Sequence, residues 1–133
     1  MSRKRVIGPD WPGYGALTYV PAVAARGEVL FTSGLNAMGP DGNVLAPGDV
    51  VGQARIIYER LAEILQVAGG SLADVVKTTD YIVSREGYSA TAAVRREFLG
   101  PDFCAATGVV VRELLGRGVL IEIEAVAVLP SGE

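Results

Sequence analysis

Residues 49–68 constrain the fold of this chain more than any other segment. Their apolar side chains recur at steps of three and four residues, which is the period of an α-helix. Asp49 is a suitable N-cap and Gly69 a suitable stop, so the sequence predicts one long helix here. Because this helix is apolar along one side only, it needs a second layer of structure to cover that side.

The segments before and after this helix favour β-structure. They are short, rich in β-branched residues and separated by glycine and proline, which break regular structure. We expect the strands at 22–25 and 29–33 to form a β-hairpin around the Arg26-Gly27-Glu28 loop. The predicted strands cover residues 3–7, 22–25, 29–33, 75–83, 105–111 and 120–128, and a second helix covers residues 86–99.

The order β-β-β-α-β-α-β-β predicts an α+β fold in a single domain that spans residues 1–133. We expect one six-stranded mixed sheet with both helices on one face, so that the opposite face still carries apolar side chains. The chain is 50% hydrophobic with a mean hydropathy of +0.33, yet no apolar stretch approaches the roughly 18 residues of a membrane span. Burial between subunits therefore accounts best for the apolar excess.

The absence of histidine excludes several kinds of active site. With no histidine and one cysteine, the chain cannot form a Ser-His-Asp triad, a Cys-His dyad or a usual zinc site, and we expect no metal and no cofactor. A single cysteine cannot form an intrachain disulfide, which favours a cytoplasmic location. The net charge of −3, with scattered arginines, argues against a nucleic-acid partner. No membrane partner is expected either.

Four short motifs occur along the chain in a characteristic order. They are Leu-Phe-Thr-Ser-Gly at 30–34, the long helix with its Ala-Gly-Gly end, Leu-Ala-Asp-Val-Val-Lys at 72–77, and Ile-Glu-Ile-Glu-Ala-Val-Ala at 121–127. Together they resemble the RidA/YjgF/YER057c/UK114 family over nearly the whole chain. The resemblance implies a chorismate-mutase-like fold of the bacillus type, a homotrimer around a central barrel and a small-molecule cleft at each subunit interface. It also implies hydrolysis of reactive imines and enamines to keto acids and ammonia.

The resemblance assigns roles to individual residues. Tyr19 matches a tyrosine in a loop that closes over the cleft, and Ser33 and Gly34 match a turn whose main chain helps to position the attacking water. We predict that these three residues bind the substrate. Glu122 matches the glutamate that positions the water, so it is the predicted catalytic residue. The alternative for Glu122 is a structural strand glutamate paired with an arginine.

One segment departs from the family. Residues 104–107, Cys-Ala-Ala-Thr, lie over a Pro-Ala-Arg-(Ser/Thr) motif whose arginine binds the substrate carboxylate, so Ala106 replaces this arginine. A charged hydrogen bond of that kind contributes about 1.5–3 kcal/mol, and alanine contributes none. Either another arginine replaces it, or the substrate lacks the carboxylate, or the chain is a non-catalytic relative. Cys104, Ala106 and Thr107 remain predicted substrate-binding residues.

Some of these residues also have ordinary structural interpretations. Cys104 is either a reactive thiol at the cleft or a small buried hydrophobe, and no neighbour in sequence supplies a cation to lower its pKa. Thr107 either orients a ligand or is an ordinary strand threonine. Arg112 shares a strand face with Ala106, but about 20 Å of strand separates them, so only a neighbouring subunit could bring Arg112 to the site.

These observations predict a small-molecule hydrolase that acts on an imine, an enamine or a related C–N compound, with Glu122 positioning the water. The alternative is a non-catalytic ligand-binding or regulatory trimer of the same fold. An endoribonuclease, an activity sometimes attached to the family, is a third possibility. It has little physical support in an acidic chain without histidine.

Overall fold

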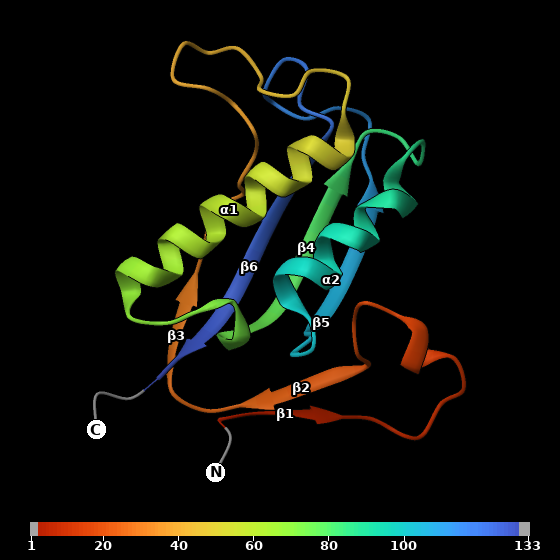
Figure 1. The fold of residues 1–133 in the computed structure, drawn as a ribbon, viewed down its shortest axis with the longest axis vertical. Coiled ribbons are helices and arrows are strands. Elements are labelled where there is room, and N and C mark those ends of the chain that lie inside the picture. Colours follow the sequence, from red (N-terminus) through yellow and green to blue (C-terminus); the bar gives the residue numbers. More distant parts are fainter. Residues whose placement is uncertain (1–2, 131–133) are drawn as a thin grey trace.

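The computed structural model describes residues 3–130 of the chain (Figure 1). Its strands are β1 (Lys4–Ile7), β2 (Ala22–Ala25), β3 (Glu28–Phe31), β4 (Val75–Ile82), β5 (Ala105–Val110) and β6 (Ile121–Leu129). Its helices are α1 (Val50–Ala68) and α2 (Ala92–Leu99), and its short 3-10 turns are η1 (Tyr14–Ala16), η2 (Leu72–Asp74) and η3 (Tyr88–Thr91). The predicted order of strands and helices and the α+β class are therefore confirmed.

The strands form two separate sheets. The main sheet has the order β3-β6-β4-β5 and is mixed, because β4 and β5 run parallel while the other neighbours run antiparallel. The smaller sheet is an antiparallel ribbon of β1 and β2. The prediction of one six-stranded sheet is therefore wrong for residues 3–130, although the predicted mixed pairing is present in the main sheet.

The two sheets separate at Gly27. This residue has a φ of +136°, and a β-carbon on it would lie 2.8 Å from Val128 Cγ1. Glycine is therefore needed for the backbone to turn this close to β6. After the turn β3 pairs with β6, while β2 pairs with β1, so the predicted hairpin between residues 22–25 and 29–33 is wrong.

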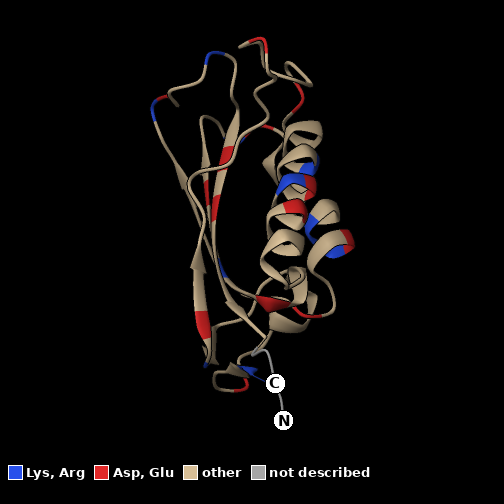
Figure 2. Cartoon of the chain, turned by 90° about the vertical axis from the view of Figure 1, so that its left-hand side faces the viewer, with Lys and Arg blue, Asp and Glu red and all other residues tan. Residues whose placement is uncertain are grey.

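The long helix α1 forms as the sequence predicts. The Asp49 side chain caps it by accepting a hydrogen bond from the Gly52 amide at 2.9 Å, and Gly69 follows its end with a left-handed φ of +87°. Both helices cover the same face of the main sheet, as predicted (Figure 2). The core between these layers includes Ala54, Ile57, Tyr58, Leu61 and Leu65 of α1 and Ile121, Ile123, Ala125 and Ala127 of β6.

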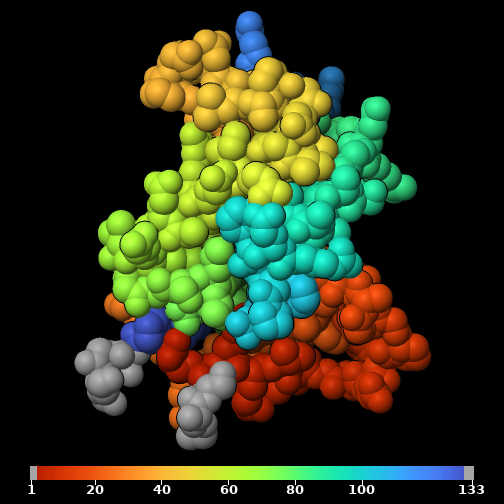
Figure 3. All heavy atoms as spheres, viewed as in Figure 1, coloured from red at the N-terminus to blue at the C-terminus, as the bar shows by residue number. Residues whose placement is uncertain are grey.

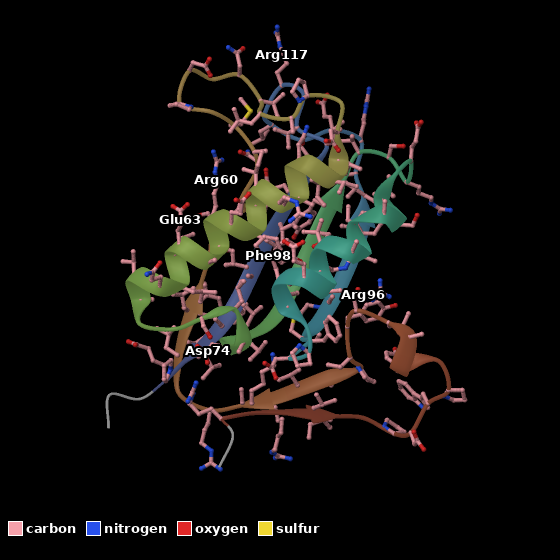
Figure 4. The ribbon with its side chains drawn as sticks, in the orientation of Figure 1. Arg60, Glu63, Asp74, Arg96, Phe98 and Arg117 are labelled. Atoms are coloured by element: carbon pink, nitrogen blue, oxygen red, sulfur yellow. The ribbon has the colours of Figure 1, made fainter. Side chains whose placement is uncertain are left out.

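The second helix is shorter than predicted. Regular α-helix begins at Ala92 rather than at residue 86, because Gly87 adopts a left-handed φ of +76° and a 3-10 turn follows it. Further along α2, Phe98 lies between the helices (Figure 4) and stacks on Tyr58 of α1, with 5.7 Å between the ring centroids. The helices and the N-terminal segment lie side by side in the space-filling view (Figure 3).

The opposite face of the main sheet is uncovered in the single chain, and we call it the open face. Val29 and Phe31 of β3 point to it and are 48% and 75% exposed. Glu122 and Glu124 of β6 point to the same side, since they alternate with the buried residues of that strand. The open face therefore carries the uncovered apolar side chains that the hydropathy leads us to expect.

Candidate functional site

The Ser33-Gly34 motif forms a bulge beside the last strand. The flanking residues Thr32 and Leu35 donate hydrogen bonds from their amides to carbonyls of β6, at 3.0 and 2.8 Å. Ser33 and Gly34 lie between these two bonds, opposite the single residue Glu124 of β6. Two residues facing one is the arrangement of a β-bulge, which takes backbone groups out of the regular ladder.

The carboxylate of Glu122 lies against this bulge. A β-carbon on Gly34 would lie 2.8 Å from Glu122 Cδ and would overlap with Oε2 of the same side chain. Position 34 therefore requires glycine as long as Glu122 keeps this position. Strand β6 and the end of β3 thus bring together two predicted parts of the site, the Glu122 carboxylate and the Ser33-Gly34 main chain.

The two glutamates of β6 differ in their partners. Glu124 accepts a hydrogen bond from the Tyr81 hydroxyl at 2.5 Å, and this bond raises the pKa of Tyr81. Glu122 has no hydrogen-bond or ion-pair partner among residues 3–130. Its oxygens therefore remain available to a water or a ligand. The alternative interpretation is that Glu122 pairs with an arginine, and no such ion pair is present within the described part of this chain.

A second group of residues surrounds a cavity of about 270 Å³, which we call the Arg95 cavity. It lies where the edge strand β5 meets β4, η3, α2 and the loop before β2. Its lining residues are Tyr19, Asp80, Tyr88, Arg95, Ala106, Thr107 and Gly108. The lining thus includes Tyr19, Ala106 and Thr107, which the sequence assigns to substrate binding. It also includes the charged residues Asp80 and Arg95, which the sequence does not assign to the site.

The strand register explains why Ala106 faces this cavity. In the parallel pairing of β4 and β5, Ala106 lies opposite Thr78, and Gly108 lies opposite Asp80. Thr78 and Asp80 are buried on the face that the helices cover, at 1% and 3% exposure. Because both β5 residues are small, they leave space at this edge of the sheet.

Aromatic packing and a backbone bond hold Tyr19 beside β5. The Val20 amide donates to the Cys104 carbonyl at 3.1 Å, which fixes the loop to the start of the strand. The Tyr19 ring packs edge-on against Tyr14, with centroids 6.0 Å apart, and Tyr14 in turn contacts Trp11. These residues form an aromatic N-terminal segment that borders the cavity.

An arginine does line this cavity, but it comes from helix α2. Arg95 Nε donates to Thr18 Oγ1 at 2.9 Å, and its Nη1 donates to Thr91 Oγ1 at 2.6 Å. The guanidinium lies 3.7 Å from Asp80 Oδ2 and 5.3 Å from the centroid of the Tyr88 ring. Sequence reasoning missed Arg95 because it sought the cation on the strand motif, and no local pattern marks this helical arginine.

Cys104 and Thr107 have structural surroundings. Cys104 is 1% exposed and does not line the Arg95 cavity, and burial raises the pKa of its thiol. This favours the interpretation of Cys104 as a small buried hydrophobe. The Thr107 hydroxyl accepts a hydrogen bond from Lys77 Nζ at 2.6 Å, so it is already engaged within the chain.

All but one of the predicted site residues therefore fall into two groups. Glu122, Ser33 and Gly34 lie together beside β6, Tyr19, Ala106 and Thr107 border the Arg95 cavity at the β5 edge, and Cys104 belongs to neither group. Strand β4 lies between β5 and β6 in the sheet. One copy of the chain thus holds both groups without bringing them into one cleft.

The range 3–130 contains neither a metal-binding cluster of side chains nor a helix suited to cross a membrane. Within that range, no three His, Cys, Asp or Glu side chains gather in a way that could hold a metal ion. No helix in the same range has the length and apolar character to cross a membrane.

Comparison with known proteins connects this arrangement with a family. The family described as "Endoribonuclease L-PSP" matches residues 14–129. A RutC family protein of Synechocystis sp. is 34% identical over 114 residues, which are 85% of this chain and 87% of that protein. The chain belongs to the RidA/YjgF/UK114 family. As a Rid protein, the chain is expected to share the fold of its relatives, and solved structures of such relatives allow the two folds to be compared.

Solved structures have the same fold as this Rid chain. The Rid family protein YyfB of Yersinia pestis, described as a protein of unknown function, matches with a TM-score of 0.87 and 31% identity, over 96% of this chain and 100% of that one. RidA of Psychrobacter sp. matches with a TM-score of 0.69 and 28% identity, over 84% of this chain and 89% of that one.

One further sequence relative bears on the cellular location of the family. It is a Schizosaccharomyces pombe protein, 37% identical over 103 residues, and it is named mitochondrial.

Proposed function

We propose that this Rid protein is a small-molecule hydrolase that acts on an imine, an enamine or a related C–N compound. The observation that supports this most is the Glu122 carboxylate, which has no partner within the described range 3–130 and lies against the backbone of the Ser33-Gly34 bulge. A free carboxylate beside main-chain groups can orient a water and accept its proton. The reaction needs neither a metal nor a cofactor.

The proposed reaction is the addition of water to a C=N bond. Glu122 accepts a proton as the water oxygen bonds to the imine carbon, and the nitrogen takes up a proton as its π-bond breaks. The resulting carbinolamine then releases ammonia and leaves a carbonyl compound, so that one imine and one water give one ketone and one ammonia. Backbone groups of Ser33 and Gly34 hold the reacting groups in place, and Tyr19 closes the site.

The proposal includes assembly as a homotrimer. The open face presents apolar side chains such as Val29 and Phe31, which a second copy of the chain would cover. The division of the predicted residues into two groups supports the same idea, because a neighbouring copy could complete a cleft from the Glu122 group of one chain and the Tyr19 group of another. We expect the trimer to be cytoplasmic, although one relative is named mitochondrial.

The test measures ammonia release from freshly generated imines and enamines. We expect Glu122→Gln to lower turnover about 100-fold or more, because positioned acid–base groups contribute on the order of 10²–10⁴. Glu124→Gln is the matched control, since Glu124 lies two residues along the same strand and is held by Tyr81. It should retain turnover within a few-fold of the unmodified protein. Equal activity of all three proteins would exclude this function for Glu122.

The second candidate is a non-catalytic ligand-binding or regulatory trimer. Ala106 supports it, because the strand cation that would hold a substrate carboxylate is missing. Small metabolites that raise the melting temperature without ammonia release would favour this candidate. The endoribonuclease description of the family remains a third possibility, which is disfavoured by the net charge of −3. Absence of RNA binding at both low and high salt would exclude it.

A further inference from the structure

One nitrogen of the Arg95 guanidinium is not used by the chain itself. Nε donates to Thr18 Oγ1 at 2.9 Å, and Nη1 donates to Thr91 Oγ1 at 2.6 Å. The third nitrogen, Nη2, has no hydrogen-bond partner among residues 3–130. It is also not one of the fully buried polar atoms in that range that lack a partner, so it keeps accessible surface. Both N–H donors of Nη2 are therefore available to a ligand.

The guanidinium end of Arg95, rather than its aliphatic stem, borders the Arg95 cavity. The guanidinium carbon lies 5.3 Å from the centroid of the Tyr88 ring, and Nη1 lies 3.7 Å from Asp80 Oδ2. Tyr88 and Asp80 both line the cavity. Because the bonds to the two threonines already hold the guanidinium in place, a ligand that binds there orders this side chain little further.

Two hydroxyl groups add further donors to the cavity lining. The Tyr19 hydroxyl has no hydrogen-bond partner among residues 3–130. The Thr107 oxygen accepts a hydrogen bond from Lys77 Nζ at 2.6 Å, which leaves the hydrogen of this hydroxyl free to donate. The carboxylate of the lining, Asp80, is buried and accepts the Tyr88 hydroxyl at 2.7 Å. The side chains of the lining therefore offer a bound molecule more donors than acceptors.

The charges around the cavity also favour an anion. Arg95 and Asp80 belong to the lining, and Lys77 contacts it through Thr107. Two cations are thus opposed by one carboxylate, although the chain as a whole has a net charge of −3. Lys77 forms no ion pair among residues 3–130, so no carboxylate of that range neutralises it. A bound anion would balance this local excess of positive charge.

We propose that the Arg95 cavity binds a small carboxylate. Arg95 Nη2 donates to one carboxylate oxygen, and the hydroxyls of Thr107 and Tyr19 donate to the other. Charged hydrogen bonds of this kind are about twice as strong as neutral ones. The Tyr19 and Tyr88 rings suit an aromatic or other apolar group on the same ligand.

The inference gives a physical meaning to Ala106. Its methyl group leaves space in the cavity that a longer side chain would fill. Of the three explanations for the missing strand arginine, the inference selects replacement by an arginine from elsewhere in the fold, on α2. It goes beyond the proposed function, because it concerns binding alone and needs no reaction at Glu122.

Two probes of nearly the same size and shape, benzoate and benzamide, test the preference for a carboxylate. Benzoate is an anion at pH 7, whereas benzamide is uncharged. Binding to the full chain is measured by calorimetry at constant ionic strength. We expect benzoate to bind about ten-fold more tightly or better, which is the effect of one charged hydrogen bond. Equal binding of the two probes, tighter binding of benzamide or failure of both to bind would overturn the inference.

Arg95→Gln tests the residue that supplies the cation. We expect benzoate to lose about ten-fold or more in affinity, while benzamide changes by less than about three-fold. The matched control is Arg96→Gln, the same change one position along α2 (Figure 4). Arg96 is exposed, donates to the Ala16 carbonyl and does not line the cavity, so this variant should bind benzoate as the unmodified protein does. Unchanged benzoate binding by Arg95→Gln, or an equal loss in both variants, would contradict the inference.

A comparison without ligand covers the case in which Arg95→Gln does not fold. Ala106→Glu and Ala106→Gln introduce side chains of equal size into the cavity, and only the glutamate carries a carboxylate. We expect Ala106→Glu to have the higher melting temperature at pH 7 and low salt, because its carboxylate pairs with Arg95. The difference should shrink as the salt concentration rises. An equal or lower melting temperature of Ala106→Glu at low salt would overturn the inference.

The cavity proposal and the hydrolase proposal can fail independently, because ammonia release is measured in a separate assay. Benzoate binding without ammonia release from any imine or enamine would support the cavity assignment and contradict the hydrolase. Ammonia release without benzoate binding would do the reverse.

Discussion

The two faces of the main sheet hold carboxylates in opposite environments. On the open face, Glu122 has no partner among residues 3–130, but it lies where water can hydrate its charge. On the helix side, Asp80 is 3% exposed, one of its oxygens has no hydrogen-bond partner among residues 3–130, and burial raises the pKa of this carboxyl. The same functional group therefore meets opposite degrees of solvation on the two faces of one sheet. Water stabilises the charge of a hydrated carboxylate, whereas a buried carboxylate depends on the hydrogen bonds that the protein itself provides.

The largest expected effect concerns the packing beneath the helices. Ile123→Ala removes a side chain that is 1% exposed and leaves a cavity between β6 and α1, so we expect a loss of about 2–5 kcal/mol in the free energy of unfolding. Urea denaturation measures it. Val29→Ala on the open face should lower the free energy of unfolding by much less than Ile123→Ala does. The two variants are compared at a protein concentration at which they have the same oligomeric state. Equal losses would mean that the two faces are equally buried in solution.

The next effect concerns the contact between the bulge and Glu122. Gly34→Ala places a methyl group where the Glu122 carboxylate lies, so this side chain must move and we expect ammonia release to fall about 100-fold. Circular dichroism should remain that of a folded protein. A variant that is fully active would show that the position of Glu122 against the bulge has no part in the reaction.

The smallest effect concerns the pH dependence of stability on the buried side. Because burial raises the folded-state pKa of Asp80 above its ordinary value of 3.8, folding favours the protonated form. The stability from this group is therefore present below the ordinary pKa and is lost as pH rises through the folded-state pKa. Asp80→Asn cannot ionise, so its melting temperature relative to the unmodified protein should be higher at pH 7 than at pH 3. The opposite trend would mean that Arg95 outweighs the burial of Asp80.

Local sequence signals were sufficient for much of the fold. The cap at Asp49 and the stop at Gly69 act through their own neighbours, so the ends of α1 could be predicted closely. The alternation around Glu122 correctly separated the two faces of β6. The turn at Gly27 could not be predicted in this way, because its conformation is enforced by Val128 at the other end of the chain.

The candidate site was predictable to a lesser extent. The approach of Glu122 to Gly34 follows from the family resemblance, which placed both residues at the same site. Arg95 and Asp80 belong to α2 and β4, and only tertiary packing brings them beside Ala106. A strand motif can show that a cation is missing from one position. It contains no information about a cation that a helix supplies from elsewhere in the fold.

The turn at Gly27 has a consequence for how copies of this chain avoid uncontrolled aggregation. By sending β2 to a different sheet, it leaves the outer edge of β3 without a neighbouring strand among residues 3–130, and β5 forms the other border of the sheet. Unpaired strand edges of this kind can form hydrogen bonds with strands of other chains. Here β3 is only four residues long and is followed at once by the bulge, so it offers an intruding strand little length along which to pair.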